Sequence, residues 1–352
     1  MREKFIVFLH DLSEGVRNLS KVSAVTNLYP FLSCAGVETD KGADIFAQYD
    51  FVKSVAEIAR VSVCAERTGA SVGNDYITSG GDGVTVAVID TGISSHIDFT
   101  LPQRIVHFVD LIADGRAPYD DNGHGTAVAG VLAGSGLMSG GKHRGVAPGA
   151  KLVAIKAINS SGEGSTLEIL QSMQWLYNNH KKYNIKVACM SFGSPPAGKN
   201  DPLALGAAAL WEQGIIVVAS GGNAGPDNST IMSPGICPNI ITVGGADTSA
   251  ENIGIADFSS RGPANGFNKP DIIAPAVDIT SCGNNEDYIQ ISGTSISAPM
   301  VAGAAAVILS RRPSYTADKV KEVILKTASH LSCPINACGH GILNMPAILK
   351  AL

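Results

Sequence analysis

The sequence SGTSISAP at residues 292–299 runs directly into the alanine-rich stretch MVAGAAAVIL at residues 300–309. A serine between a glycine turn and a long helix lies at the helix N-terminus, where free backbone N–H groups and the helix dipole stabilise negative charge. Pro299 agrees with a helix start, because proline is disfavoured in a helix interior. Taken alone, the pattern is more typical of an ordinary capped helix, and either Ser295 or Ser297 could serve as a nucleophile.

Two upstream segments supply an acid and a base. The β-branched run VTVAVI at residues 84–89 is typical of a buried strand, and it ends at Asp90. Open α/β sheets place their active sites just past such strand ends. His124 lies between two glycines, so that backbone and substrate can approach its imidazole closely. Singly, Asp90 could be a structural cap and His124 a loop residue, but with a serine they form the set that nucleophilic catalysis requires.

A further segment supplies a hydrogen-bond donor. The run GIIVVA at residues 214–219 predicts another buried strand, which leads into SGGNAG at residues 220–225. The amide of Asn223 in this glycine loop can donate to an oxyanion, and losing such a donor costs about 2.7–4 kcal/mol of transition-state stabilisation. The alternative role of Asn223 is that of a simple turn residue.

These segments together resemble the signatures of the subtilisin family of serine proteases. The matching segments are Asp90-Thr-Gly, His124-Gly-Thr, Gly222-Asn223 and Gly293-Thr-Ser295, in that family's order. The likeness covers roughly residues 75–350, and it includes GVAP at 145–148, FSSRGP at 258–263 and PDIIAP at 270–275. Residues 119–126 and 220–226 look most like the intracellular AprX-type branch.

The resemblance implies a role for each of these residues. Ser295 would be the nucleophile, His124 the general base and then the acid, and Asp90 the residue that orients His124. Asn223 and the backbone N–H of Ser295 would form the oxyanion hole. The Gly-Thr-Ser match selects Ser295 over Ser297, which keeps a packing or capping role.

Two departures from the family pattern are mild. Ala127 replaces a second histidine, and ISA at residues 296–298 replaces the usual Met-Ala-Ser/Thr. Neither change removes a catalytic atom. We therefore expect an active serine endopeptidase that cuts extended or unfolded polypeptides through an acyl-enzyme. The alternatives are a catalytically silent peptide-binding scaffold of the same fold and a dinucleotide-binding protein. The latter is disfavoured because glycines 80, 81 and 83 precede the first strand instead of following it.

The resemblance also predicts a substrate cleft. Two cleft-edge segments, at residues 162–165 and 191–193, would take an extended peptide as an added strand. Phe192 either walls an apolar pocket or is ordinary core. Met232 falls where many relatives carry a small residue, and we expect it to fill the pocket for the side chain before the cut, so that small or modest apolar side chains are preferred there. The predicted substrate-binding residues are Gly162, Gly164, Ser191, Phe192, Gly193, Gly222 and Met232.

Strands and helices alternate through the proposed catalytic domain, residues 75–352. This alternation predicts a mostly parallel central sheet covered on both faces, the three-layer α/β fold that the resemblance implies. The predicted strands are 84–89, 152–158, 187–191, 215–219 and 240–243, and the predicted helices include 165–179, 203–213 and 316–327.

Residues 1–66 differ from the rest of the chain. Segment 4–9 predicts a strand, 12–22 a weak helix, 45–58 a helix and 59–64 a final alternating strand. This small α+β pattern resembles the family's propeptide, a ferredoxin-like chaperone that inhibits its own protease by placing its last strand in the active-site cleft. Residues 67–74 would then be a linker and the zone of self-cleavage in a zymogen. The alternative is a fixed subdomain that is never removed.

Composition bounds the remaining choices. The chain has 352 residues, of which 45% are hydrophobic and 16% charged, with a formal charge of −5. This hydrophobic content is enough for a large core, and the negative formal charge does not favour binding to nucleic acid. The apolar segment at residues 5–9 is shorter than a signal peptide requires, and no run approaches a membrane span, so we expect a cytoplasmic protein without a membrane partner.

Cysteines and carboxylates predict no required cofactor. The chain has seven cysteines, an odd and scattered set that favours reduced thiols over a disulfide framework. Cys333, Cys338 and His340 are too few for a typical zinc site, and a disulfide between the two cysteines would need oxidation. Relatives often bind calcium after the histidine helix, but the loop 134–143 offers no carboxylate here. Asp110, Asp114, Asp120 and Asp121 could hold a weaker ion, but the pattern is more typical of solvated loop carboxylates.

Overall fold

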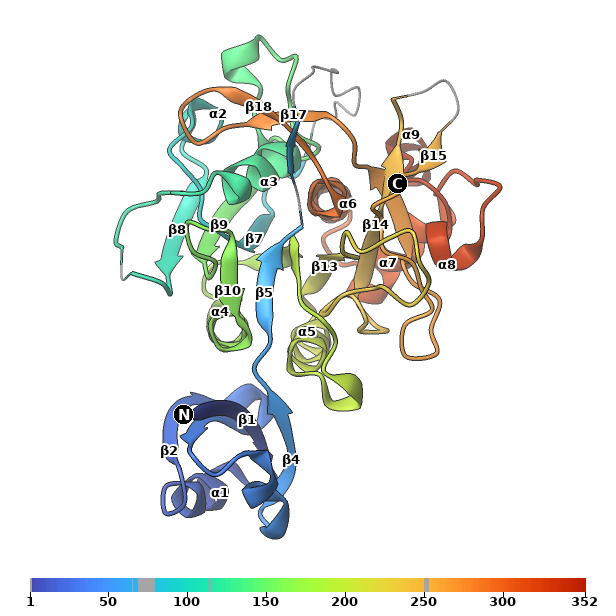
Figure 1. Ribbon diagram of the computed structural model, residues 1–352. Helices are drawn as coiled ribbons and strands as arrows, with labels where there is room; N and C mark the ends of the chain where they lie inside the picture. The colour runs from blue at the N-terminus through green and yellow to red at the C-terminus, as the bar shows by residue number, and fades with distance from the viewer. Residues whose placement is uncertain (1, 65, 69–79, 114, 250–252) are drawn as a thin grey trace.

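The computed structural model describes residues 2–64, 66–68, 80–113, 115–249 and 253–352. In Figure 1 a small N-terminal unit lies below a larger domain, and strand β5 (Arg60–Val63) passes from the first into the second. The larger domain carries every residue of the predicted Asp, His, Asn and Ser set.

An eight-stranded sheet forms the centre of the large domain. Its order is β15-β14-β13-β11-β7-β9-β8, with β16 paired to β14. Neighbours run parallel except for the edge strand β15. Because every residue of β7 is buried, both faces of the sheet are covered. The strands are β7 (Thr85–Asp90), β8 (Ile105–Asp110), β9 (Lys151–Lys156), β11 (Ile185–Met190), β13 (Ile216–Ser220), β14 (Ile241–Asp247), β15 (Gly254–Ile255) and β16 (Ile272–Pro275).

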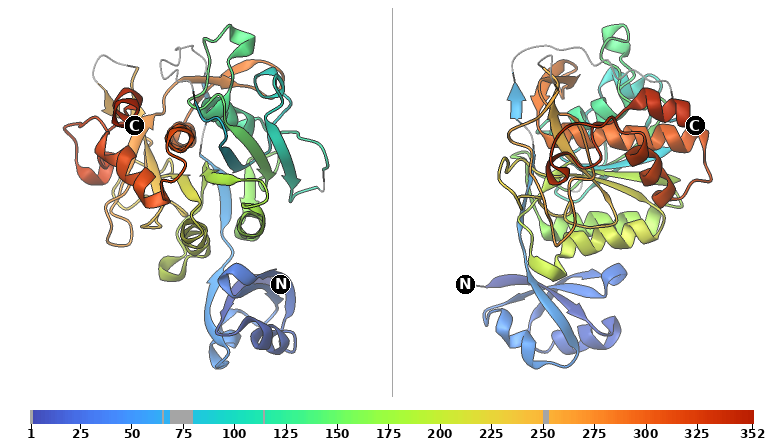
Figure 2. Two further views of the ribbon diagram at one scale, coloured as in Figure 1. Left: turned by 180° about the vertical axis from the view of Figure 1, so that it is seen from behind. Right: turned by 90° about the vertical axis from the view of Figure 1, so that its right-hand side faces the viewer.

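Helices cover this sheet on both faces, which confirms the predicted three-layer α/β fold (Figure 2). Helices α3 (His124–Ala133) and α6 (Thr294–Arg311) lie on one face, and α4 (Thr166–Asn179) and α5 (Pro202–Glu212) lie on the other. Helices α7 (Ala317–Lys326) and α9 (Met345–Ala351) pack against α6.

Helix α6 begins earlier than Pro299 suggested. Its first residue is Thr294, so Pro299 lies inside the helix. The helix is long and apolar enough to cross a membrane, with a mean hydropathy of 1.2 over 18 residues, but 89% of it is buried within the domain. It is the central core helix of the large domain.

The N-terminal unit is a four-stranded antiparallel sheet of order β2-β3-β1-β4. Residues 45–58 do not form the predicted helix: a 3-10 turn, η2 (Ala43–Gln48), is followed by strand β4. Pairing of β4 with β1, as in Val55 opposite Val7, overrides the local apolar spacing. The elements are β1 (Glu3–Leu9), α1 (Leu12–Leu19), β2 (Ala24–Tyr29), β3 (Cys34–Thr39) and β4 (Val52–Glu57).

The small sheet is apolar on both faces. Phe5 and Val7 pack with Phe46 into the core of the small unit itself. Ile6 and Phe8, which point the other way, belong to the core of the large domain. The second face is therefore covered by the large domain.

Helices α4 and α5 form the docking surface for that face. The Tyr29 hydroxyl donates to the Leu167 carbonyl at 3.0 Å, and the Phe31 N–H donates to Oε1 of Gln174 at 3.1 Å. The rings of Phe31 and Tyr177 lie 5.7 Å apart. These contacts orient the small unit on the large domain.

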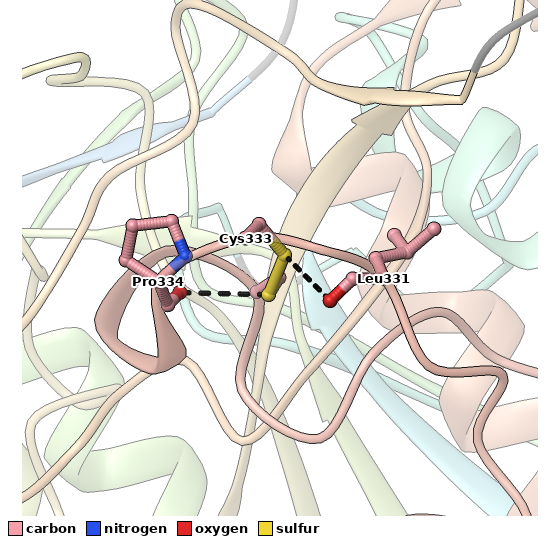
Figure 3. Close-up of a disulfide and its surroundings, with 4 residues drawn as sticks. Leu331, Cys333 and Pro334 are labelled. Carbon is pink, nitrogen blue, oxygen red and sulfur yellow. Dashed lines mark hydrogen bonds between the residues drawn. A yellow bond between two sulfur atoms is a disulfide. The ribbon is translucent and has the colours of Figure 1, made fainter.

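Two cysteines correct the prediction of reduced thiols. Cys333 and Cys338 form a disulfide across a short turn, with Cα atoms 6.4 Å apart (Figure 3). The two sulfurs lie 3.7 Å and 3.4 Å from the carbonyl oxygens of Leu331 and Pro334. A pair joined in this way offers no thiolate to zinc. The other cysteines, at positions 34, 64, 189, 237 and 282, are free and buried.

Candidate active site

Strand β7 and helix α3 bring Asp90 and His124 together. Asp90 is the last residue of β7, and its Oδ1 lies 2.7 Å from Nδ1 of His124, the first residue of α3. Both side chains are buried. Gly125 makes this approach feasible, because a Cβ there would collide with the Gly92 carbonyl oxygen and lie 3.0 Å from the Asp90 Cβ.

Asp120 anchors the loop that presents His124, and sequence reasoning assigned it only to a weak ion cluster. Its buried carboxylate accepts hydrogen bonds from the Gly123 N–H at 2.8 Å and from the N–H and hydroxyl of Thr126 at 2.9 Å and 2.7 Å. It also accepts the Thr91 hydroxyl at 2.8 Å. Asp120 thereby satisfies N–H groups at the start of α3 and ties that helix to the end of β7.

A buried lysine, which sequence reasoning missed, holds the same two segments. Lys156 is fully buried at the end of β9, and its ammonium lies 2.7 Å from the Thr91 carbonyl and 2.7 Å from Oδ1 of Asp121. The Ile158 carbonyl is a third acceptor at 3.1 Å. A lysine at the carboxyl end of a predicted inner strand is the signal that could have revealed it.

Helix α6 presents Ser295 as its second residue. The Ser295 hydroxyl and the His124 Nε2 are both buried, and neither makes a hydrogen bond within the part of the chain that the structure describes. The Ser297 hydroxyl is occupied instead, since it reaches the backbone carbonyls of Ala274 and Pro275 at 2.9 Å and 3.0 Å. Of the two candidate hydroxyls, only that of Ser295 is left free of such backbone acceptors.

The amide of Asn223 is oriented by Thr294. Its Oδ1 accepts the Thr294 N–H at 3.0 Å and the Thr294 hydroxyl at 2.8 Å. These two bonds fix which end of the amide is the donor. Its Nδ2 consequently donates to the backbone carbonyl of Cys64 at 2.7 Å, and the Ser295 N–H points to the same oxygen at 3.4 Å. Thr294 was not singled out as a positioning residue from the sequence.

The segment that supplies this carbonyl is strand β5, which lies in the large domain and not in the sheet of the small unit. It pairs antiparallel with β10 (Glu163–Ser165) on one side and with β12 (Phe192–Gly193) on the other. Val61 lies opposite Gly164, and the Val63 N–H donates to the Gly162 carbonyl at 3.1 Å. The predicted cleft edges thus bind an extended segment by backbone hydrogen bonds.

Next to this strand lies a pocket of about 260 Å³ lined by Val63, His124, Ser161 and Ile291, with other neighbours. His124 therefore adjoins the strand one residue before the carbonyl that Asn223 and Ser295 hold. The predicted base and the carbonyl held by the predicted oxyanion donors thus lie at adjacent positions along the segment 63–64.

Of the remaining predicted substrate-binding side chains, Met232 packs beside two predicted cleft glycines, whereas Phe192 and Ser191 are buried. Met232 packs against the backbone of Gly193 and Gly222, since Cβ atoms on either glycine would come within 2.9 Å of its side chain. The side chain of Phe192 is fully buried in the core of the large domain, and its backbone pairs with Val63 of β5. The hydroxyl of Ser191 is buried and lies 3.5 Å from the Cys189 thiol.

One group of described residues, His96, Asp98 and Cys282, is compact enough to hold a metal ion. The His96 Nδ1 accepts the Asp98 N–H at 3.1 Å, so its Nε2 carries the proton that points to the Asp287 carbonyl. Burial raises the pKa of Cys282 well above its usual value, and its thiol donates to Oδ2 of Asp98 at 3.6 Å. Neither group offers a free ligand atom.

The Asp98 carboxylate is occupied by the loop 134–143. Its two oxygens accept the N–H groups of Gly136 and Met138 at 3.0 Å and 3.1 Å, and the Tyr288 hydroxyl at 2.8 Å. Donor groups face the carboxylate, whereas calcium would need further oxygen ligands. This loop does not fit a calcium ion.

The acidic cluster before His124 is also occupied. Asp110 accepts the Tyr119 hydroxyl at 2.7 Å and the N–H groups of residues 112, 113 and 115. Asp120 binds the start of α3, and Asp121 pairs with Lys156, as described above. Asp114 lies outside the described residues. The three described carboxylates thus stabilise loops and do not form an ion cage.

Comparison with known proteins agrees with this geometry. A model of the subtilase family matches residues 81–341. Serine protease AprX of Bacillus subtilis (strain 168) is 40% identical over 287 residues, a match that covers 73% of this chain and 64% of AprX. Subtilisin Savinase of Lederbergia lenta is 35% identical over 270 residues, covering 77% of this chain and 92% of Savinase.

Among solved structures, fervidolysin from Fervidobacterium pennivorans, a keratinolytic enzyme related to subtilisin, superposes with a TM-score of 0.80. It is 21% identical, and the superposition covers 99% of this chain and 61% of fervidolysin. This likeness concerns the fold alone, and it includes the small unit as well as the large domain.

A buried carboxylate–imidazole pair, a serine at a helix N-terminus and an amide aimed at a carbonyl oxygen define the Ser-His-Asp class of hydrolase. The chain belongs to the subtilase family of serine proteases, as its sequence predicted. Its match spans less than two thirds of the length of AprX.

Proposed function

We propose that this chain is a serine endopeptidase made as a self-processing zymogen, with its N-terminal unit as inhibitor and first substrate. One observation carries the proposal: a backbone carbonyl of the chain itself lies against Asn223 and the Ser295 N–H, beside the Asp90–His124 pair. Polypeptides in extended conformation are the proposed substrates, because β10 and β12 bind β5 through its backbone.

The geometry supports a stepwise acyl transfer. His124 removes the proton from the Ser295 hydroxyl as that oxygen attacks the carbonyl carbon, and Asp90 stabilises the resulting imidazolium. The negative charge on the carbonyl oxygen is held by the Asn223 amide and the Ser295 N–H at the positive end of α6. His124 then protonates the leaving amine, and water hydrolyses the ester through the same groups in reverse. We propose that this cycle requires no metal, because the described carboxylates near the site are already hydrogen-bonded.

Intact mass and active-site labelling test this function. Freshly folded wild-type chain should lose roughly its first 65 residues, react with a fluorophosphonate probe and digest unfolded casein. Ser295→Ala should remain full length and unlabelled, whereas Ser297→Ala should behave like the wild type apart from modest destabilisation. A processed, folded wild type that neither labels nor digests casein would favour the silent scaffold. Turnover that survives Ser295→Ala but not Ser297→Ala would overturn the assignment of the nucleophile.

A further inference from the structure

We propose that the bond which this zymogen cuts in itself is Cys64–Ala65, and that Met232 restricts the pocket before the cut to side chains about the size of cysteine. The inference rests on the proposed function and specifies its first substrate. It places the cut ahead of the zone 67–74 that the resemblance to a propeptide suggested.

The position of the bond follows from the Cys64 carbonyl. Its oxygen is 2.7 Å from the Asn223 Nδ2 and 3.4 Å from the Ser295 N. Both donors belong to the proposed oxyanion hole, and the reacting oxygen of a substrate must lie within reach of both. The described residues 66–68 lie past this site, and Val63 lies before it.

Backbone pairing on both sides fixes that register. Before Cys64, β5 is held between β10 and β12. After the cut, the chain continues as β6 (Glu66–Thr68), which pairs antiparallel with β18 (Tyr288–Ser292), Glu66 opposite Ser292. A shift by one residue would break both sets of pairs and turn each side chain to the opposite face. Ala65 itself lies outside the described residues.

The large domain buries two side chains of the segment 60–64, and these are three residues apart. Val61 and Cys64 are buried, whereas Arg60 and Ser62 are exposed. Val61 is fully buried in the core of the large domain. The large domain therefore contacts the side chain of Cys64, just before the proposed cut, and that of Val61, three residues upstream.

Met232 closes the pocket that receives the Cys64 side chain. A Cβ built on Gly193 would lie 2.7 Å from the Met232 Sδ and 3.4 Å from the Cys64 Sγ. The two side chains therefore lie side by side against the backbone of Gly193. On Gly222 a Cβ would also lie 2.7 Å from the Met232 side chain. Burial raises the pKa of the Cys64 thiol to about 12, so the pocket holds a small neutral group. A longer side chain would have to displace Met232.

The chemistry of the cut is ordinary hydrolysis. The Ser295 oxygen bonds to the Cys64 carbonyl carbon, and the carbon–nitrogen bond to Ala65 breaks. The amine of Ala65 leaves with the proton that His124 took from Ser295. Water then releases Ser295 and leaves Cys64 as a C-terminal carboxylate. The thiol takes no part in the reaction.

Intact mass of the full-length chain after refolding tests the bond. Wild type should give two products, residues 1–64 and 65–352, while Ser295→Ala gives neither. A cut at any other bond, including one within 67–74, would overturn the inference. If that misplaced cut still depended on Ser295 and the product still digested casein, the proposed endopeptidase would stand. Loss of all Ser295-dependent hydrolysis would remove the proposed function as well.

A compensating pair of substitutions tests the pocket. Cys64→Leu should slow self-cleavage roughly 10- to 100-fold, because overfilling a packed site costs about 1–3 kcal/mol. Met232→Ala in the same chain should restore most of that rate. Cys64→Ala should be cut within a few-fold of wild type, and Ser62→Leu, the same enlargement at an exposed position of β5, should have a similarly small effect.

Two results would contradict the role of Met232. One is a Cys64→Leu chain that is cut as fast as wild type. The other is a double variant that stays slow although, in the Ser295→Ala background, it melts at the same temperature as Met232→Ala. Equal melting of these uncut chains shows that the double variant has folded, so a slow cut cannot be attributed to misfolding.

Discussion

The small N-terminal unit and the large domain bury their apolar residues in different ways. The large domain surrounds its parallel sheet with helices of its own. The small unit covers one face of its sheet with α1 and η2 and leaves the other, with Ile6 and Phe8, to α4 and α5 of the large domain. The strand that follows the small unit in the chain, β5, likewise pairs with strands of the large domain. The small unit thus depends on the large domain to cover one face of its sheet, whereas the large domain covers its own sheet.

One substitution separates the chemistry of the large domain from its binding of the small unit. Asp90→Asn should lower the self-cleavage rate on the order of 10⁴-fold, because the imidazolium of His124 loses its charged partner while the geometry is kept. A time course of intact mass measures the rate. The melting temperature should change little, since the amide can replace the carboxylate as a hydrogen-bond acceptor.

Cleavage at near wild-type speed in Asp90→Asn would show that Asp90 does not act on His124 during the reaction. Ser297→Ala provides the control. It removes a hydroxyl from the same core region of α6 without touching the Asp90–His124 pair.

A second substitution separates oxyanion binding from strand binding. Asn223→Ala should slow self-cleavage about 10²- to 10³-fold, because one of two donors to the carbonyl oxygen is lost. β5 should stay in the cleft, since its pairing with β10 and β12 is unchanged. Hydrogen exchange of the Val61 and Val63 amides in the Ser295→Ala background measures the second effect. Fast exchange there after Asn223→Ala would mean that the donor holds the strand and does not act chiefly on the transition state.

How far the sequence predicted the molecule also differs between the two regions. In the large domain, buried strands and helices are long and periodic, and Asp90, His124, Asn223 and Ser295 each lie at the end of such an element. Their convergence could therefore be predicted. In the small unit, residues 45–58 were wrongly predicted as a helix, because pairing with β1 decides the structure of β4.

Residues that act through tertiary contacts were missed for a related reason. Asp120 and Lys156 matter because their partners come from loops 29 and 65 residues away in the chain. Cys64 is hidden in a short alternating strand, and only its position against Asn223 marks the cut. For Lys156 the only local signal is a lysine at the end of a predicted inner strand, and no local pattern distinguishes Asp120 or Cys64 from ordinary loop or core residues.

A smaller effect is expected at the contact between the small unit and helix α4. Phe31→Ala should shorten about tenfold the lag between self-cleavage and casein digestion, because the cleaved unit loses its ring contact with Tyr177 and dissociates sooner. Leu28→Ala is the matched control: Leu28 is 49% exposed, so its loss should leave the lag unchanged. An equal lag in Phe31→Ala and wild type would show that the cleft strand alone retains the unit.

The smallest effect is expected from metal removal, and it concerns the large domain alone. Asp98 is satisfied by the N–H groups of Gly136 and Met138 and by Tyr288, so the loop 134–143 carries its own partners. Excess chelator should therefore shift the melting temperature of the processed enzyme by no more than about 2 °C, whereas Asp98→Ala, which leaves these donors unsatisfied, should lower it by several degrees. A large drop in chelator, reversed by added calcium, would show that a cation stabilises the domain after all. Such a site would have to lie elsewhere than on Asp98, whose oxygens are already bound by these donors.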